Sequence, residues 1–256
     1  GLPLRNRFFG RIAELSRWGS RLAPVSNWIA GSVPNRWFME RVLGIDRRRP
    51  LPAFAAQTFT DWFAGRRAPT EAPRGPVVLF HDTFVTYNAP GIGRAAVELL
   101  EAAGYRVELA DRKCCGRPMI SKGMLADAKA HAAYNVARLA PAVARGVPVI
   151  GLEPSCLLTL RDEYVDLLRS DEARAVAGSA FLLEEFLLRE KARGLDLAWK
   201  PGPRKALLHG HCHQKAMVGT APTVAALRWA GYEVSEVDSG CCGMAGSFGY
   251  AAEHFD

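Results

Sequence analysis

The chain has 256 residues, of which 49% are hydrophobic and 23% are charged. A chain of this length and composition can bury a sizeable core, so its fold does not depend on disulfides. It contains no apolar run of about 18 residues and therefore predicts no membrane-spanning helix. Its formal net charge is +7, but residues 1–50 alone hold ten arginines against three acids, and the remainder is neutral. The basic character thus belongs to one segment and does not indicate a nucleic-acid partner.

Residues 1–65 form the first predicted unit, a basic helical linker in which prolines interrupt amphipathic helices. Four of the six tryptophans of the chain lie in this unit: Trp18, Trp28, Trp37 and Trp62. One interpretation is that the segment packs its aromatic face on a neighbouring domain and keeps a basic outer face. The other is that it touches a membrane or another subunit, because arginines beside aromatic side chains suit an anionic surface. A proline-rich linker, residues 66–76, follows.

After this linker the pattern changes to alternating strands and helices. The runs VVLFHD, YRVELA and VPVIGLEPSC predict strands, and the segments between them have helical periodicity. This alternation is typical of a parallel α/β sheet, which we assign to a first half over residues 76–171. In such sheets functional groups collect at the carboxyl ends of the strands. The adjacent Cys114 and Cys115 follow the second predicted strand, and Cys156 ends the third.

A second half repeats the first. Residues 94–116 align without a gap on residues 221–243, with ten of 23 positions identical and a Cys-Cys-Gly triplet in each copy. This self-similarity predicts two α/β halves of the same design, the second over residues 204–256, with connecting helices over 172–195. Only 14 residues follow the last cysteine, too few for the helix and strand that follow the triplet in the first copy. We therefore expect a fragment that ends before its second half is complete.

The cysteines admit several interpretations. A disulfide framework fits poorly, because the core is large and adjacent cysteines form only strained bridges. Inert buried thiols are a second alternative, but they account poorly for two equivalent glycine-flanked pairs. Thiolates are soft ligands that suit zinc or an iron–sulfur cluster. Because the Cys-x-x-Cys clips usual for zinc are missing, ligands gathered from several strand ends favour iron–sulfur over zinc. The candidate metal ligands are Cys114, Cys115, Cys156, Cys212, Cys241 and Cys242.

The order of these cysteines resembles that of the cysteine-rich CCG domain, which occurs twice in one of the subunits of heterodisulfide reductase. The shared pattern is a leading Cys, then Cys-Cys-Gly, then Pro-x-Cys. It is also similar to a subunit of the anaerobic glycerol-3-phosphate dehydrogenase and to the glycolate oxidase iron–sulfur subunit. The phrases LFHDTFVTYNAPGIG, HGHCHQKA and CCGMAGSFGY look closest to the C-terminal region of long bacterial FAD-linked, iron–sulfur D-2-hydroxyacid dehydrogenases. The resemblance covers essentially the whole chain.

The chain departs from the family pattern at several ligand positions. Asp82 stands where the leading Cys of the first half belongs, and Cys156 stands alone where the family has Cys-x-x-Cys. Each half keeps three cysteines of the five in the complete motif, so the resemblance implies one cluster shared by buried cysteines of both halves. We expect Asp82 near it as a hydrogen-bonding or oxygen-ligand group. His211 and His213 flank Cys212 and could ligate metal or donate hydrogen bonds to cluster sulfur, with a polar loop as the alternative.

The resemblance implies an electron-transfer module. In the similar enzymes a flavin domain oxidises a D-2-hydroxyacid such as 2-hydroxyglutarate, lactate or glycolate, and electrons pass through ferredoxin-like and CCG domains to a quinone or another acceptor. This chain lacks a dinucleotide fingerprint and ferredoxin cysteine spacing. We therefore expect FAD and catalysis on another domain and a 4Fe-4S cluster here. The expected location is the cytoplasm, with peripheral contact at the inner face of the bacterial membrane as one option. The alternative function is a zinc-stabilised or metal-free docking scaffold.

Overall fold

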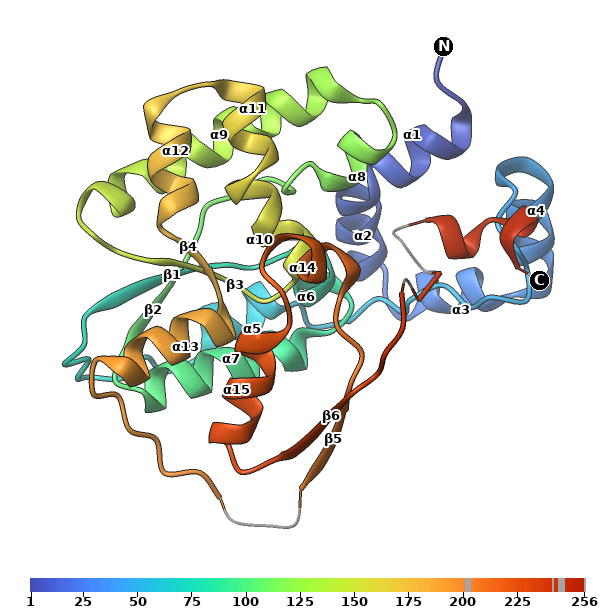
Figure 1. Cartoon of the computed structure of the whole chain (residues 1–256). Helices are drawn as coiled ribbons and strands as arrows, with labels where there is room; N and C mark the ends of the chain where they lie inside the picture. The colour runs from blue at the N-terminus through green and yellow to red at the C-terminus, as the bar shows by residue number, and fades with distance from the viewer. Residues whose placement is uncertain (201–203, 241, 244–246, 256) are drawn as a thin grey trace.

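The structure, a computed structural model, describes residues 1–200, 204–240, 242–243 and 247–255. Its centre is a four-stranded parallel sheet in the order β2-β1-β3-β4. The strands are β1 (Pro76–Phe80), β2 (Arg106–Leu109), β3 (Val149–Gly151) and β4 (Ala180–Leu182). Helices cover both faces of the sheet (Figure 1). The α/β fold class predicted from the alternation of strands and helices is confirmed.

Each face of the sheet carries its own layer of helices and its own core. One layer contains α9 (Leu125–Ala144), α10 (Pro154–Arg161), α11 (Glu163–Leu168) and α12 (Asp171–Gly178). The other layer contains α5 (Phe59–Gly65), α7 (Pro90–Ala102) and α13 (Leu183–Ala192).

The central strand β1 is apolar throughout because it is covered on both faces. Val78 and Phe80 join the core under α9, whereas Val77 and Leu79 join the core under α7. Successive side chains of a strand point to opposite faces, so a strand between two helical layers has no polar face. This explains why the sequence shows a short continuous apolar run here instead of an alternating one.

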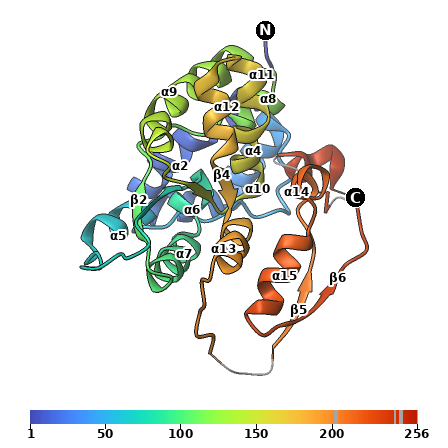
Figure 2. The same ribbon diagram turned by 60° about the vertical axis from the view of Figure 1, so that its left-hand side comes forward.

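The second half has a separate two-stranded parallel sheet, β5 (Lys205–Leu208) with β6 (Glu233–Glu236). Two helices connect these strands: α14 (Cys212–Met217) and α15 (Ala221–Trp229). The start of β6 lies 127 residues after the start of β2, as the repeat requires. The glycine after each cysteine pair, Gly116 and Gly243, has a positive φ in both copies. The repeat is thus confirmed in the described residues, and Figure 2 shows this half beside α13 and α10.

Two expectations about strands are wrong. The third strand ends at Gly151, well before Cys156, because Glu153 caps helix α10 and Pro154 occupies its first turn. The connection over residues 172–195, expected to contain only helices, includes β4, which adds a fourth strand to the sheet. That strand lies within the apolar run AFLLEEFLL, where periodicity does not separate a short strand from a helix.

The N-terminal segment wraps one side of the first half. Its helices are α1 (Leu4–Gly10), α2 (Ile12–Arg21), α3 (Val25–Gly31) and α4 (Val33–Leu43), followed by α5. Helix α1 packs on α8 (Arg117–Ser121), and α2 packs on α6 (Thr83–Tyr87).

The two ends of the described chain meet next to α4. The short 3₁₀ turns η1 (Phe248–Tyr250) and η2 (Ala252–His254) lie beside it in Figure 1. The backbone N–H of Asp46 donates to the Tyr250 carbonyl at 2.8 Å, which ties these turns to the residues that follow α4. No helix of the described part is long and apolar enough to cross a membrane.

Phe59 anchors the N-terminal segment to the first half, and its removal tests that docking. Its ring is fully buried against α7, where a Cβ atom at Gly93 would lie only 2.6 Å from it. Phe59→Ala should lower the free energy of unfolding by about 3–5 kcal/mol, measured by urea denaturation. Trp28→Ala is the control, because 76% of Trp28 is exposed, and it should change stability by less than about 0.5 kcal/mol. Equal stabilities for the two variants would contradict the docking of α5.

Candidate metal centre

Three loops of the first half meet at the carboxyl edge of the main sheet. Asp82 follows β1, Cys114 and Cys115 follow β2, and Cys156 follows β3. Strand β1 lies between β2 and β3. The connection from β1 to β2 and the connection from β2 to β3 therefore run across the sheet in opposite directions. Ligands of open α/β sheets bind at this switch in strand order. The fold therefore brings together the predicted site residues of the first half.

The thiols of this edge are close together and shielded from solvent. The Sγ atoms of Cys115 and Cys156 lie 3.2 Å apart, within hydrogen-bonding distance. Cys114 and Cys115 are buried and hydrogen-bonded to each other, and Cys156 is partly buried in the first turn of α10. Inert core thiols would not need to be brought together from two different strand ends.

The pKa of each of these thiols is raised. The hydrogen bond to Cys115 and burial raise the pKa of Cys114. For Cys115, the hydrogen bond with Cys114 lowers the pKa, but the hydrogen bond with Cys156 and burial outweigh it. For Cys156, the hydrogen bond with Cys115 lowers the pKa, but burial and the charges of Glu153 and Asp82 raise it to about 12. The metal-free site therefore holds neutral thiols at neutral pH, and a bound cation would reverse this by deprotonating them.

Asp82 is buried beside the thiols with one oxygen paired and one free. Its Oδ1 atom caps α6 by accepting the N–H groups of Phe84 at 2.8 Å and Val85 at 2.9 Å. Its Oδ2 atom is buried and has no hydrogen-bond partner in the structure. Burial raises the pKa of this carboxyl, and the charge of Glu153 adds to that effect. An unpaired buried carboxylate oxygen is costly unless it binds something.

The loop that carries Cys114 and Cys115 is held by residues that the sequence did not single out. Asn135 on α9 and Tyr164 on α11 hydrogen-bond to its backbone, and His131 Nδ1 lies 3.1 Å from the Cys114 carbonyl. Helical spacing alone makes Asn135 look like any polar residue of a long helix. No sequence signal could have connected it with a loop some twenty residues earlier.

A charged contact links the two halves at the start of α10. Glu153 Oε2 accepts the backbone N–H of Cys156 at 2.6 Å, and Glu153 Oε1 lies 3.6 Å from His211 Nε2. The same His211 nitrogen lies 3.2 Å from Ser155 Oγ, while its Nδ1 accepts the N–H of His213 and caps α14. The structure thus places His211 beside the helix that carries Cys156. Glu153 was not predicted from the sequence.

The cysteines of the second half lie differently from the expectation. Cys212 and Cys242 are exposed, so the prediction that they are buried is wrong, and Cys241 lies outside the described residues. The physical reason is that the described part of this half supplies only β5 and β6, without a second helical layer over its strand ends. Lys215 Nζ does tie the two loops together by donating to the Ser239 carbonyl at 2.7 Å.

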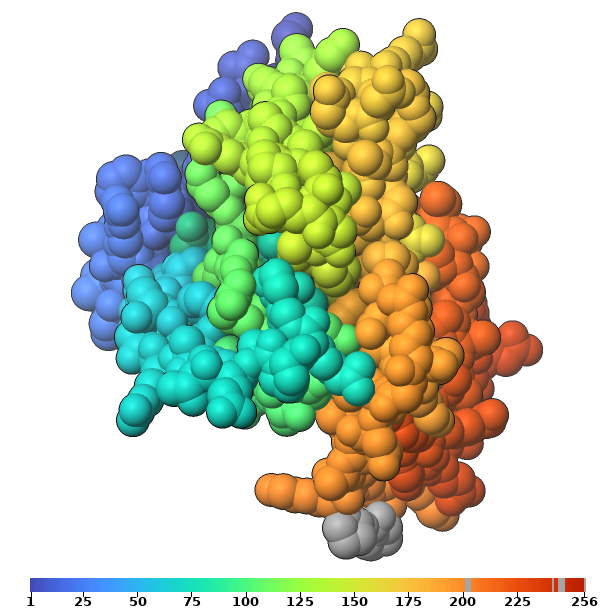
Figure 3. Space-filling view, turned by 90° about the vertical axis from the view of Figure 1, so that its left-hand side faces the viewer, coloured from blue at the N-terminus to red at the C-terminus, as the bar shows by residue number. Residues whose placement is uncertain are grey.

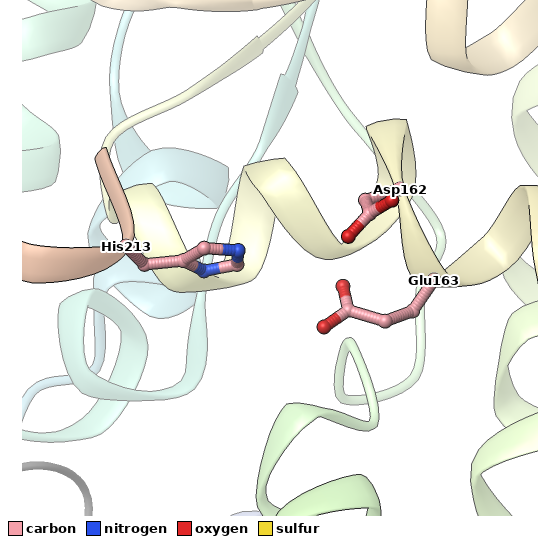
Figure 4. A group of neighbouring side chains, drawn as sticks. All are labelled: Asp162, Glu163 and His213. Atoms are coloured by element: carbon pink, nitrogen blue, oxygen red, sulfur yellow. The ribbon is translucent and has the colours of Figure 1, made fainter. Parts of the chain in front are cut away.

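His213 faces two acids on the first half. One ligand atom each of His213, Asp162 and Glu163 lies within 4.8 Å of the others, and Figure 4 shows the three side chains converging. Glu163 already forms a salt bridge with Arg117, and Asp162 is exposed. Burial lowers the pKa of His213, and the positive charge of Arg117 adds to that effect. The cluster is therefore a polar contact between the halves, in which the ion pair Arg117–Glu163 belongs to the first half.

The comparison with protein families identifies the first half. Residues 78–161 match the family model of the CCG cysteine-rich domain. This segment runs from β1 to the end of α10 and contains the three thiols and Asp82. Residues 78–161 are therefore similar to the cysteine-rich domain, as the resemblance stated from the sequence predicts.

Particular relatives extend beyond this domain. The chain is 34% identical over 255 residues to the subunit designated C of the anaerobic glycerol-3-phosphate dehydrogenase of Escherichia coli K12, covering 98% of this chain and 64% of that protein. It is 28% identical to D-2-hydroxyglutarate dehydrogenase of Pseudomonas putida, over 70% of this chain and 17% of that protein. It is 29% identical to lactate utilization protein A of Geobacillus thermodenitrificans, over 67% of this chain and 73% of that protein. The chain thus spans 64% of the length of the glycerol-3-phosphate dehydrogenase subunit that it matches. No solved structure matches it significantly.

Thiol labelling of the metal-free protein checks this arrangement. Exposed Cys212 and Cys242 should react with iodoacetamide first. Peptide mapping by mass spectrometry measures the labelling of each cysteine. Cys156 should react slowly, since thiolate is the nucleophile and a pKa of about 12 leaves roughly one thiolate in ten thousand at pH 8. Its labelling rate should rise about tenfold between pH 8 and pH 9, while the fraction of thiolate is still small. Labelling of Cys156 as fast as Cys212 in the folded protein would contradict the structure.

Proposed function

We propose that this chain is the iron–sulfur electron-transfer module of a flavin-linked dehydrogenase. The observation that carries the proposal is the meeting of three thiols with an unpaired buried carboxylate oxygen at the strand-order switch of a CCG domain. Soft thiolates gathered from several loops suit an iron–sulfur cluster. When bound, such a cluster takes up and releases single electrons.

The residues present fit this group. Cys114, Cys115 and Cys156 would supply thiolates, and the free Oδ2 of Asp82 would supply the fourth donor in place of the leading cysteine. Four donors are what a 4Fe-4S cluster requires, so we propose that type. Gly116, at a φ of 87°, turns the chain directly after the cysteine pair. A Cβ atom there would lie 3.4 Å from the backbone of Ala128, so a glycine lets this turn pack closely against α9.

The site of the first half can serve without ligands from the second. Its four donors come from three adjacent loops of one sheet, whereas Cys212 and Cys242 face solvent. We therefore propose that the first half binds the cluster. In this proposal the second-half cysteines, His211 and His213 are not ligands of the cluster.

The names of the relatives suggest the parent reaction. They contain glycerol-3-phosphate, D-2-hydroxyglutarate and lactate, and each of these compounds carries a hydroxyl group on a secondary carbon. We propose that a flavin domain elsewhere, holding FAD, oxidises such a CH-OH group. Electrons would then pass through a ferredoxin-like domain and this module to a quinone or another acceptor. A D-2-hydroxyacid remains the proposed substrate class.

Reconstitution with iron tests the proposal. Anaerobic treatment of the full chain with ferrous iron and sulfide should give a brown protein whose visible absorption dithionite bleaches. The double variant Cys115→Ser, Cys156→Ser should lose at least about nine-tenths of the bound iron, because it removes half of the four donors that a cluster requires. Cys212→Ser is the matched control and should keep the bound iron. A colourless wild-type protein that binds zinc instead would favour the scaffold alternative and overturn the redox function.

Variants at Asp82 test whether its carboxylate is the fourth ligand, by the same measurement of bound iron. Asp82→Ala should lower the iron content, and Asp82→Cys should restore it by returning the thiolate that the family places there. Full iron content and an unchanged reduction potential in Asp82→Ala would remove Asp82 from the ligand set.

The N-terminal helices carry a surface that suits the membrane. We call it the arginine–tryptophan surface. Arg21 lies over the Trp18 ring at 5.2 Å, and Arg41 lies over Trp37 at 5.8 Å. Figure 3 shows the N-terminal segment, in blue, along one side of the molecule. The exposed apolar side chains of this surface are Trp18, Leu22, Val25, Trp28, Ile29, Val33, Trp37, Phe38 and Val42.

We propose that this surface makes peripheral contact with anionic lipid on the cytoplasmic side of the bacterial membrane. Aromatic side chains enter the interface, and arginines next to them pair with lipid headgroups. Such contact would bring the module close to a membrane quinone. The acidic face of a partner protein is the competing occupant.

Vesicle co-sedimentation separates these options. The protein should pellet with vesicles rich in phosphatidylglycerol at low salt and be released as salt is raised, because the Debye length shrinks to about 10 Å at 0.1 M. The double variant Trp28→Ser, Trp37→Ser should lose binding. Leu207→Ser is the control, since Leu207 is 75% exposed on β5, outside this surface, and should bind normally. Equal binding by the tryptophan variant would refute the proposed surface.

A further inference from the structure

Two polar side chains lie fully buried behind the cysteine loop. Asn135 of α9 and Tyr164 of α11 are both 0% exposed, and Tyr164 sits within the hydrophobic core under α9. Burying an amide and a phenol is costly unless each hydrogen bond is satisfied. Their partners therefore indicate what these two residues are for.

All of these partners belong to the loop or to the pair itself. Asn135 Oδ1 accepts the backbone N–H of Lys113 at 2.8 Å, and its Nδ2 lies 3.3 Å from the Cys114 carbonyl. The same Nδ2 donates to the Tyr164 hydroxyl at 2.8 Å. Tyr164 in turn donates its O–H to the Cys115 carbonyl at 2.9 Å. Two side chains thus hold three consecutive residues of the loop.

Outside this pair, the loop is fixed by side-chain contacts, such as that of His131 Nδ1 at 3.1 Å from the Cys114 carbonyl. Within the described chain, residues 112–115 make no backbone–backbone hydrogen bond, although both flanking strands and helices do. The N–H groups of Gly116 and Arg117 hydrogen-bond to the Cys114 and Cys115 thiols. The direction of those N–H groups depends on the backbone that Asn135 and Tyr164 hold in place.

The Tyr164 hydroxyl also lies within electrostatic reach of all three sulfurs. Burial raises the pKa of Tyr164, and the thiolate forms of Cys115, Cys114 and Cys156 raise it further. This hydroxyl is therefore a fixed dipole that acts on any charge the sulfurs carry when they ligate metal. Its proton points to the Cys115 carbonyl and offsets the negative end of that peptide dipole.

We infer that Asn135 and Tyr164 are positioning residues that hold the Cys114–Cys115 loop in its ligating conformation and raise the reduction potential of the group bound there. The inference rests on the proposed iron–sulfur function. Without the Tyr164 O–H, the Cys115 carbonyl would be left as an unpaired negative dipole in the residue whose thiol is a proposed ligand. That dipole disfavours an added electron, so the potential moves to more negative values.

Tyr164→Phe tests both the positioning role and the effect on the reduction potential, because it keeps the ring and removes only the hydroxyl. Tyr134→Phe is the matched control: Tyr134 is on the same helix as Asn135 and its hydroxyl bonds to the side chain of Asp111. In the metal-free protein, Tyr164→Phe should raise the iodoacetamide labelling rate of Cys115 about fivefold, which is the effect of losing one hydrogen bond of about 1 kcal/mol. Tyr134→Phe should leave the rate unchanged. Equal rates in wild type and Tyr164→Phe would overturn the positioning role.

The reduction potential of the reconstituted protein is the second measurement. A dye-mediated titration followed by electron paramagnetic resonance should give a more negative midpoint for Tyr164→Phe and the wild-type value for Tyr134→Phe. An unchanged midpoint would overturn the tuning role. Asn135→Ala breaks the same network from the other end and should move the labelling rate and the midpoint in the same directions. If wild type binds no iron, the proposed function fails, while the labelling comparison still decides whether the pair holds the loop.

Discussion

The parallel pairing of β1 with a neighbour on each side is the constraint on which the rest of the structure depends. Parallel strands need crossover helices, and these crossovers are right-handed. Since β2 and β3 lie on opposite sides of β1, the crossover helices α7 and α9 are forced onto opposite faces of the sheet. The same geometry aligns the carboxyl ends of all three strands. The loops that carry the thiols and Asp82 are therefore neighbours because of the strand order.

The two halves differ in how they enclose their cysteines. In the first half, α9 and α11 reach behind the loop and supply polar groups to its backbone. In the described part of the second half, no second layer covers β5 and β6, and a leucine of β5 remains exposed in a strand whose counterpart β1 is buried. The repeated sequence thus produces one enclosed site and one open pair of loops. Equal motifs do not give equal environments when the surrounding layers differ.

Much of the fold could be predicted from the sequence, because apolar periodicity and glycine positions are local signals. The strands β1 and β2, the long helix α9 and the repeat all follow from such signals. The short strand β4 could not be predicted, because it lies within an apolar run that also suits a helix. The start of α10 could not be predicted, because it follows strand β3 without a clear change in composition. For the site, the cysteines of the first half could be singled out from their pattern, and Asp82 from the resemblance to the family. Asn135, Tyr164 and Glu153 were not, because their role comes from tertiary contacts with distant backbone groups.

The side chain of Glu153 contacts both halves of the chain. One oxygen of this carboxylate holds the N–H of Cys156, and the other faces His211 of the second half. A duplicated protein can normally let its two copies diverge separately, because each keeps its own contacts. Here a single side chain serves both copies, so a substitution that moves the histidine loop also moves the support of the cysteine helix. The positions of these two loops are therefore coupled through one carboxylate.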